Sequence, residues 1–226
     1  MGESGAGKTT LLNLVLGLLE PTEGRITLEG TSWSPLPESE RRPRRPKVQA
    51  VFQEATASLP PHRTGWEILQ EPLTIWRRGT KGHHREAAAR MAARVKFPEG
   101  ALDQFPGDWS GGLAQRLCLG RALMLEPALL VLDEPCSALD PTLAAHLLAL
   151  LLEVKAGGTA LLLVSHDLPL VAALCDQLLV LKDGESVGQG TTRQFLSNSE
   201  HPYVRALWEA LPRLPLSTPS APQPQS

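Results

Sequence analysis

The stretch "GESGAGKTT" at residues 2–10 decides the fold. It fits the spacing G-x-x-x-x-G-K-[ST], which is typical of a phosphate-binding loop between a buried strand and a helix. Its glycines let backbone N–H groups converge on phosphate oxygens at a helix N-terminus, where the helix dipole favours anions. We expect Lys8 to bind the β- and γ-phosphates and the Thr9 hydroxyl to ligate Mg²⁺. The residues expected around the nucleotide are Gly2, Glu3, Ser4, Gly5, Ala6, Gly7, Lys8, Thr9 and Thr10.

The composition is that of an ordinary globular protein. The chain has 226 residues, 42% hydrophobic, 20% charged and a net charge of −2, enough for one core with a smaller lobe. The near-balanced charge gives no electrostatic reason to expect nucleic acid as the main partner. No apolar run reaches the roughly 18 residues needed to span a bilayer. The cysteines Cys118, Cys136 and Cys175 lack metal-ligand spacing and are expected to be small buried hydrophobes.

Apolar strands alternate with helices along most of the remaining chain. Strands are predicted at 24–30, 48–53, 128–135, 158–167 and, as a hairpin, 177–190. This alternation predicts an α/β fold of the P-loop NTPase type, a mostly parallel sheet flanked by helices. The polar, proline-broken segment 32–47 is expected to be a solvated connection.

The amino-acid composition changes between residues 54 and 118, where helix-forming residues dominate. We expect an inserted helical subdomain there, so that the nucleotide-binding core consists of residues 1–53 and 119–196. Residues 197–212 are expected to form a C-terminal extension. The tail 213–226 is rich in proline and serine and is predicted to be disordered.

Two predicted strands end in residues that suit phosphate chemistry. "ALLVLDEP" should end at Asp133, and ligands of such sheets lie at the carboxyl ends of the strands. Asp133 is thus placed to hold Mg²⁺ through water, and Glu134 to orient and deprotonate an attacking water. The simpler alternative is a charged pair at a helix start. "LLLVSHD" places His166 at the end of another strand, either as a packing residue or as a sensor of the γ-phosphate.

The order of these motifs resembles ATP-binding cassette (ABC) ATPases over residues 2–196. The phosphate loop is followed by Gln53, "WSGGLAQR" (109–116), "LLVLDEP" (129–135), "SALD" (137–140) and "SHD" (165–167). The resemblance implies that Gln53 touches Mg²⁺ and couples to a membrane partner, that Asp140 belongs to the D-loop and that His166 is the switch residue. It assigns Ser110, Gly111 and Gly112 to the signature motif, which contacts the γ-phosphate held by the opposite subunit.

The "SGG" stretch supports the signature assignment on chemical grounds. At a helix start it exposes N–H groups and a hydroxyl, an anion site with no nearby partner in its own chain. Two head-to-tail subunits would then sandwich two nucleotides. Hydrolysis in such a site needs positioning and charge stabilisation more than covalent chemistry.

A narrower resemblance concerns two further stretches. "VFQEATASLPPHRTGWEILQEPL" (51–73) and "HPYVRALWEALP" (201–212) are similar to the ATPases of dipeptide, oligopeptide and nickel importers. This implies an ATP-hydrolysing importer subunit that uses ATP and Mg²⁺ and is peripheral on the cytoplasmic face of the cell membrane. Its partners would be permease subunits, a second ATPase subunit and, indirectly, an extracytoplasmic solute-binding protein. The alternatives are an accessory subunit of a carbon–phosphorus lyase complex, or an inactive fragment.

The sequence departs from the family pattern in several places. Trp109 replaces the usual leucine or phenylalanine, Leu113 the usual glutamine, and Pro60 the usual asparagine. We expect weakened γ-phosphate contact at the signature and an altered permease-facing loop. The strands and the adenine-stacking aromatic residue that the family places before the phosphate loop have no counterpart, so we expect an N-terminally truncated chain with unpaired sheet edges.

Overall fold

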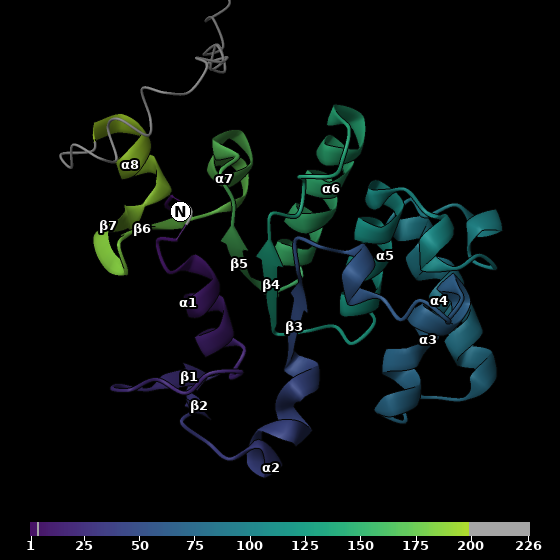
Figure 1. Ribbon diagram of the computed structural model, residues 1–226. Helices are drawn as coiled ribbons and strands as arrows, with labels where there is room; N and C mark the ends of the chain where they lie inside the picture. Colours follow the sequence, from purple (N-terminus) through teal and green to yellow (C-terminus); the bar gives the residue numbers. More distant parts are fainter. Residues whose placement is uncertain (4, 199–226) are drawn as a thin grey trace, which may run out of the picture.

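A parallel three-stranded sheet lies at the centre of the fold (Figure 1). The computed structural model describes residues 1–3 and 5–198, and its central sheet has the order β3 (Val48–Val51), β4 (Leu129–Asp133), β5 (Ala160–Val164). The middle of β4 is buried: Leu130 and Leu132 are 0% exposed. Aliphatic strands covered on both faces form such sheets because parallel strands need crossover connections that place helices over them. The predicted α/β fold is confirmed.

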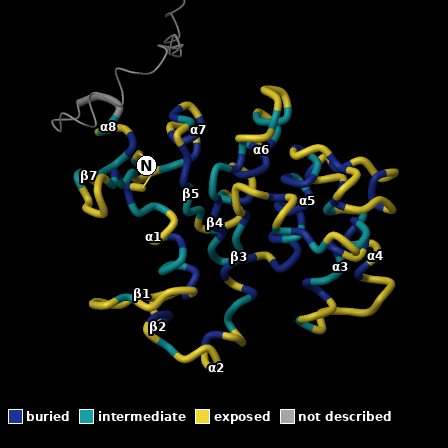
Figure 2. The backbone as a smooth tube through the Cα atoms, in the orientation of Figure 1, coloured by how far each residue is buried: buried dark blue, intermediate teal, exposed yellow. Residues whose placement is uncertain are grey.

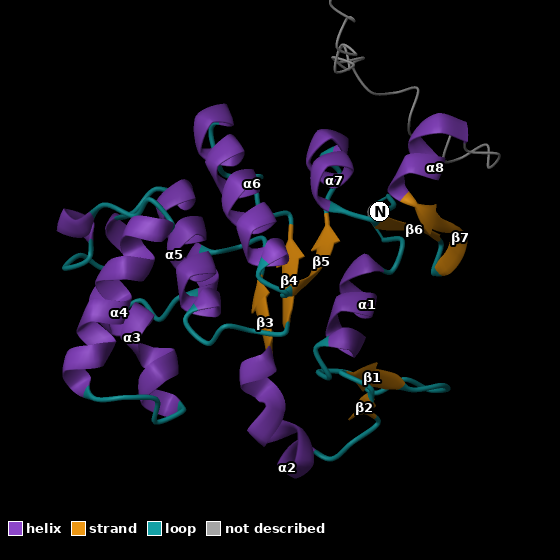
Figure 3. Ribbon diagram, turned by 180° about the vertical axis from the view of Figure 1, so that it is seen from behind, coloured by secondary structure: helices purple, strands orange, loops and turns teal. Residues whose placement is uncertain are grey.

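The two faces of this sheet pack against different elements. On one face, Val131 and Val164 cluster with Leu12 of α1 (Lys8–Val15) and with the hairpin of β1 (Ile26–Leu28) and β2 (Thr31–Ser34). On the other face, Leu130 and Leu132 pack against α5 (Gly111–Leu123), α6 (Pro141–Ala156) and α7 (Leu168–Leu174). Figure 3 shows α1 and α6 on opposite sides of the strands. Successive side chains of a strand point to opposite faces, which explains how each strand serves both layers.

A helical lobe lies beside the sheet. It consists of α3 (Gly65–Ile75), α4 (Lys81–Arg94) and the first part of α5. A capping box fixes the start of α3, where the Thr64 hydroxyl accepts from the Glu67 N–H and the Glu67 carboxylate accepts from the Thr64 N–H. His84 of α4 is buried in this lobe, and its Nε2 lies 2.7 Å from the Arg78 carbonyl oxygen. The boundary expected after residue 118 falls within α5.

The segment 32–47 is docked onto α1, so the prediction of a solvated loop is wrong. Its first residues form β2, where Trp33 is 0% exposed, and the rest form α2 (Glu38–Arg41) and a 3₁₀ helix (Arg42–Lys47). The Arg45 guanidinium donates to the Leu16 carbonyl at the end of α1 and pairs with Glu38 at 2.6 Å. Arginines that satisfy the last carbonyls of a helix replace the missing intrahelical donors. Figure 2 shows the mixture of buried and exposed backbone in this region.

The last described elements form a separate antiparallel pair. β6 (Gln177–Lys182) pairs with β7 (Glu185–Thr191), followed by α8 (Thr192–Asn198). The predicted hairpin is thus confirmed, while residues 199–212 of the expected extension and the tail 213–226 lie outside the described residues. No helix among residues 1–3 and 5–198 is long and apolar enough to cross a membrane.

Gln115 of α5 is a polar side chain in an apolar setting. It is 2% exposed, and neither its Oε1 nor its Nε2 has a hydrogen-bond partner among the described residues. The amide borders a small cavity of about 10 Å³ that Val51, Leu132 and Leu139 also line. A buried amide without partners forfeits about 1–3 kcal/mol for each unsatisfied group.

We therefore expect Gln115→Met to raise the melting temperature Tm by roughly 2–6 °C, because the thioether has a similar length and no unsatisfied amide. Thermal unfolding followed by circular dichroism measures the shift. Leu119→Met, at the same cavity, is the matched control and should give no rise. A lower Tm for Gln115→Met would show that the amide has a stabilising partner in solution.

Candidate nucleotide-binding site

The phosphate loop precedes α1 in the chain and lies beside β6. Gly7 is the N-cap of α1 with φ 94°, a left-handed conformation that favours glycine, and the helix begins at Lys8. Gly2, with φ 151°, lies against β6: a Cβ there would be 2.2 Å from the Leu181 carbonyl oxygen. Both glycines are therefore required by the backbone path. Ser4, which belongs to the predicted loop, lies outside the described residues.

The Lys8 side chain folds back over this loop. Its ammonium donates to the carbonyl oxygens of Gly2 at 2.7 Å and Glu3 at 2.6 Å. Thr9 and Thr10 in the first turn of α1 are exposed. The loop thus presents a cation and two hydroxyls at a helix N-terminus, the setting in which anions bind.

The carboxyl ends of β4 and β5 bring Glu134 and His166 together. The Glu134 Oε1 lies 2.9 Å from the His166 Nδ1, and the Ser165 hydroxyl donates to Glu134 Oε2 at 3.4 Å. The backbone of Glu134 has φ 48° and donates its N–H to the Val164 carbonyl at 2.9 Å. A non-glycine residue in this region carries strain, which is common at functional sites. The Glu134 side chain is only 14% exposed, so the carboxylate is held rather than free in solvent.

Asp133 lies beside this pair at the end of β4. Burial and the neighbouring Glu134 carboxylate raise the pKa of Asp133, while the positive charge of Lys8 opposes the rise. The positive charge of Lys8 in the phosphate loop thus acts on the carboxyl end of β4. Gln53, two residues after β3, is exposed at the same carboxyl edge of the sheet.

The signature residues lie elsewhere. Ser110 is the N-cap of α5, and its hydroxyl accepts from the Leu113 N–H at 3.3 Å. α5 and α1 cover opposite faces of the sheet (Figures 1 and 3), so the structure does not bring Ser110, Gly111 and Gly112 to the phosphate loop of the same chain. A Cβ at Gly112 would lie 3.1 Å from the Ala138 carbonyl, which packs the signature against the segment before Asp140. Asp140 itself caps α6, accepting from the Leu143 N–H at 3.0 Å.

The unusual Trp109 has a structural explanation. Its side chain is 8% exposed and packs edge-to-face on Phe97, with ring centroids 5.2 Å apart and an interplanar angle of 82°. Leu113 is half-buried against the same core. The side chains of Trp109 and Leu113 thus pack in the helical lobe. The sequence motif alone did not indicate this packing.

The fold and the site define an α/β nucleotide-binding domain of the P-loop class. The sequence matches the ABC transporter family over residues 1–137. A Brucella ovis relative, provisionally named as a peptide import ATP-binding protein, is 39% identical over 213 residues, covering 94% of this chain and 67% of its own length. The dipeptide transport ATP-binding protein DppF of Haemophilus influenzae is 38% identical, covering 95% and 66% respectively. The chain therefore spans about two thirds of the length of these relatives.

Solved structures agree with this assignment. The dimeric ATP-binding cassette MJ0796, in a post-hydrolysis state bound to ADP and Pi, aligns with a TM-score of 0.79 and 30% identity over 85% of this chain and 84% of its own. The chain belongs to the ABC transporter family and is an ATP-binding cassette of the ABC ATPase class.

The raised pKa of Asp133 leads to a stability prediction. For an acid whose pKa is higher in the folded than in the unfolded protein, the folded state binds more protons between the two values, so stability falls as the pH rises through that window. Above the pKa of the folded protein, Asp133 is ionised in both states, and its full destabilising effect on the folded state is present. We expect Asp133→Asn to raise Tm at pH 7 and to leave it nearly unchanged at pH 3, since only the neutral form is then present. Thermal unfolding across this pH range measures it; an equal rise at both pH values would contradict the electrostatic cause.

Proposed function

We propose that the chain is the ATP-hydrolysing subunit of an importer for peptides, working beside separate membrane-spanning permease subunits. The observation that carries the catalytic part is the Glu134–His166 pair, 2.9 Å apart at the sheet edge that also carries Asp133 near Lys8. The choice of peptides is supported by the names of the relatives, among them the oligopeptide transport ATP-binding protein OppF of Escherichia coli. Nickel, the other solute suggested by the sequence, has no such support.

The phosphate loop would bind the nucleotide. Backbone N–H groups of Gly5, Gly7 and the N-terminal turn of α1 would offer donors to the β-phosphate, and the Lys8 ammonium would exchange its contacts with the Gly2 and Glu3 carbonyls for phosphate oxygens. Because Lys8 already lies over the loop, this exchange needs a side-chain movement and no change of backbone.

Glu134 would act as the general base. Its carboxylate is held by His166 on one oxygen and by Ser165 on the other, which fixes its orientation toward a water that attacks the γ-phosphate. Glu134 would take the proton of that water, and His166, whose side chain is 83% exposed, would contact the γ-phosphate side of the site. The strained backbone at Glu134 supports a positioned catalytic group.

The oxygen donors at this edge fit Mg²⁺. A Thr9 hydroxyl, the Asp133 carboxylate and the Gln53 amide oxygen are hard ligands, and Mg²⁺ in such sites takes one or two carboxylates together with substrate phosphates. No cluster of three or more His, Cys, Asp or Glu side chains that could hold a metal occurs in the described part of the chain, which suits an ion held partly by the nucleotide. The bound ion would neutralise charge on the phosphates during transfer.

The signature residues would act on a second cassette. Ser110, Gly111 and Gly112 begin α5 away from the loop of their own chain, so a head-to-tail dimer is the arrangement in which they reach a γ-phosphate. The similar cassette MJ0796 was solved as a dimer, which supports the pairing of two cassettes. Asp140, packed near the signature, would lie at the same dimer interface. Ser110 and Gly111 are exposed and would be available for that contact, whereas Gly112 is buried at the start of α5.

The remaining assignments concern partners and organisation. Gln53 and the adjoining helical lobe, residues 54–118, would transmit nucleotide state from the core, residues 1–53 and 119–196, to the permease. The partners would be permease subunits, a second ATPase subunit and, indirectly, an extracytoplasmic solute-binding protein. The chain would be peripheral on the cytoplasmic face of the cell membrane.

The decisive variant is Glu134→Gln. It should bind ATP as well as the parent chain but hydrolyse it at least about a hundredfold more slowly, since the amide cannot accept a proton. Phosphate release and nucleotide binding measure the two effects, with Glu23→Gln, on an exposed turn, as the control. Lys8→Ala should instead lose tight binding. Parent-like turnover by Glu134→Gln would exclude Glu134 as the base.

The solute is tested in the cell that carries the gene. Deleting the gene should reduce uptake of labelled di- or oligopeptides, and the wild-type copy should restore it while Lys8→Ala should not, because transport requires nucleotide binding. Uptake of ⁶³Ni²⁺ should stay unchanged. A loss of nickel uptake with normal peptide uptake would reverse the assignment of the solute.

A further inference from the structure

The turn between α3 and α4 carries a cluster of cations. Residues 75–85 read IWRRGTKGHHR, which includes four lysine and arginine residues and no aspartate or glutamate, although the whole chain has a net charge of −2. We call this segment the basic turn. Figure 2 shows exposed backbone where α3 passes into α4. The lysine and arginine residues are all exposed: Arg77, Arg78, Lys81 and Arg85.

None of these four cations is paired with a carboxylate within the part of the chain that the structure describes. Arg78 donates through Nη1 to a main-chain carbonyl just past α5 at 3.0 Å, and the Arg85 guanidinium lies 3.7 Å from the centre of the Trp66 ring. The side chains of Arg77 and Lys81 make no hydrogen bond or ion pair with the described residues. Carbonyl and ring contacts orient a guanidinium without cancelling its charge, so the turn presents a positive surface.

An apolar side chain stands beside the cations. Ile75 at the end of α3 is 62% exposed, the largest exposed fraction among the large hydrophobic side chains of the described residues. Trp76 next to it is half-buried. Segments that bind to membrane surfaces combine such residues: aliphatic and tryptophan side chains enter the headgroup region while neighbouring cations meet anionic lipids.

The backbone of the basic turn is fixed before any partner binds. The Arg78 N–H donates to the Leu73 carbonyl at 2.9 Å, and the Nε2 of buried His84 lies 2.7 Å from the Arg78 carbonyl oxygen. The Thr80 hydroxyl caps α4 by accepting from the His83 N–H at 3.4 Å. An ordered turn loses little conformational entropy on binding, so its charges are presented without a folding cost.

The basic turn lies away from the nucleotide-binding residues. Arg78 attaches it to Leu125, just beyond the end of α5, whereas the signature residue Ser110 caps the start of this helix. The 13 residues of α5 at 1.5 Å each separate its two ends by about 20 Å. Figures 1 and 3 show the turn at the end of the lobe opposite to the one toward which the strands of the central sheet point. A surface bound at the turn would therefore leave the phosphate loop and the signature open.

We propose that the basic turn is a docking surface for the anionic headgroups of a lipid bilayer. Ile75 and Trp76 would enter the headgroup region, and the four cations would meet the phosphate groups of anionic lipids. Each cation near such a surface strengthens binding about fivefold. The cassette would thus touch lipid directly, in addition to its contact with permease subunits. Only the choice of the cytoplasmic leaflet rests on the proposed function.

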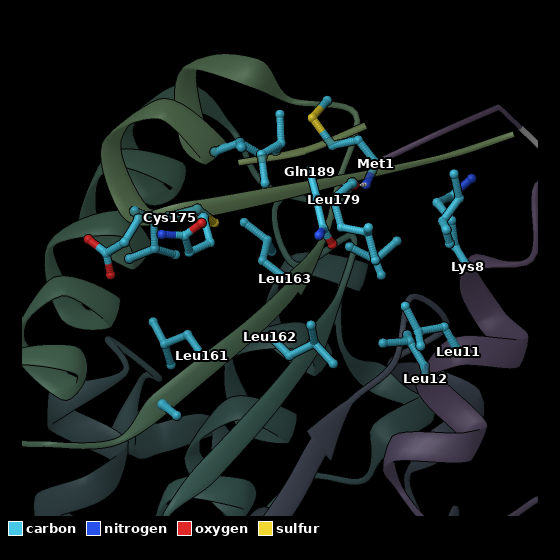
Figure 4. Close-up of a pocket in the computed structure, with 18 of the residues that line it drawn as sticks. Met1, Lys8, Leu11, Leu12, Leu161, Leu162, Leu163, Cys175, Leu179 and Gln189 are labelled. Carbon is cyan, nitrogen blue, oxygen red and sulfur yellow. Dashed lines mark hydrogen bonds between the residues drawn. The ribbon is translucent and has the colours of Figure 1, made fainter. Parts of the chain in front are cut away.

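The apolar recess between β5 and β6 does not have this combination. Leucines at 161–163 line it (Figure 4), but it is a cavity rather than a protruding surface. Its two lysines are engaged: Lys8 donates to carbonyl oxygens of the phosphate loop, and Lys155 pairs with Asp176 at 2.7 Å. The basic turn is therefore the surface that suits a bilayer.

Vesicle sedimentation of the full chain tests this surface. The chain should sediment with vesicles of equal parts phosphatidylglycerol and phosphatidylcholine and stay in solution with pure phosphatidylcholine. Arg77→Gln/Lys81→Gln should weaken binding at least about twentyfold, because two cations are lost. Neither side chain has a partner whose loss would disturb the fold. The matched control is Arg25→Gln/Arg42→Gln, which removes the same charge from exposed positions outside the turn and should bind like the parent chain.

A third variant tests the apolar part. Ile75→Ser should weaken vesicle binding about three- to tenfold, because the serine buries less apolar surface in the headgroup region. Circular dichroism should show parent-like folding, since the side chain is exposed. Duplex DNA is the other polyanion to compare, and it attracts cations through its phosphates without an apolar layer for Ile75.

Three results would overturn the proposal. Equal sedimentation with both kinds of vesicle, or none with either, would show that anionic headgroups do not attract the chain. An equal loss of binding in the two double variants would show a general effect of charge. Tight binding to duplex DNA that competes with the vesicles and that Ile75→Ser leaves unchanged would assign the turn to nucleic acid. All three are measured without ATP, so they are distinct from a failure of the proposed function, which is an absence of turnover in the parent chain.

Discussion

The parallel pairing of β4 with β5 is the constraint on which the site depends. The register places Asp133 opposite Val164, so the residues that follow each strand, Glu134 and His166, meet at the same edge. The hydrogen bond from the Glu134 N–H to the Val164 carbonyl ties the turn to the neighbouring strand, and it forces Glu134 into a left-handed conformation. A slip of one residue would turn the carboxylate to the other face of the sheet. The buried leucines of β4 prevent that slip, so the packing of the core determines the geometry of the chemistry.

The sequence contains enough to predict the arrangement of the fold and of half the site. The phosphate loop, the aliphatic run of β4 and the residues after β5 are local patterns, and the carboxyl-edge rule brings them together. The positions of Trp109 and of the arginines at 41–47 depend on contacts with residues distant in the sequence, which no local pattern reveals. Trp109 packs on Phe97, and Arg45 satisfies the end of α1, contacts whose partners are distant in sequence. From motif position alone we expected Trp109 to weaken the γ-phosphate contact at the signature, and from composition we expected the arginines in a solvated connection.

α5 joins the helical lobe to the α/β core. It begins at the signature, passes through the helical lobe and ends against the core, and its residues 111–123 form one uninterrupted helix. The helix contacts α3 and α4 of the lobe and also β3 of the sheet. Arg121 makes the connection direct, because its guanidinium donates to the Ser58 carbonyl, five residues after Gln53. The boundary expected after residue 118 follows the change in amino-acid composition. It nevertheless lies inside α5, the helix that joins the helical lobe to the α/β core.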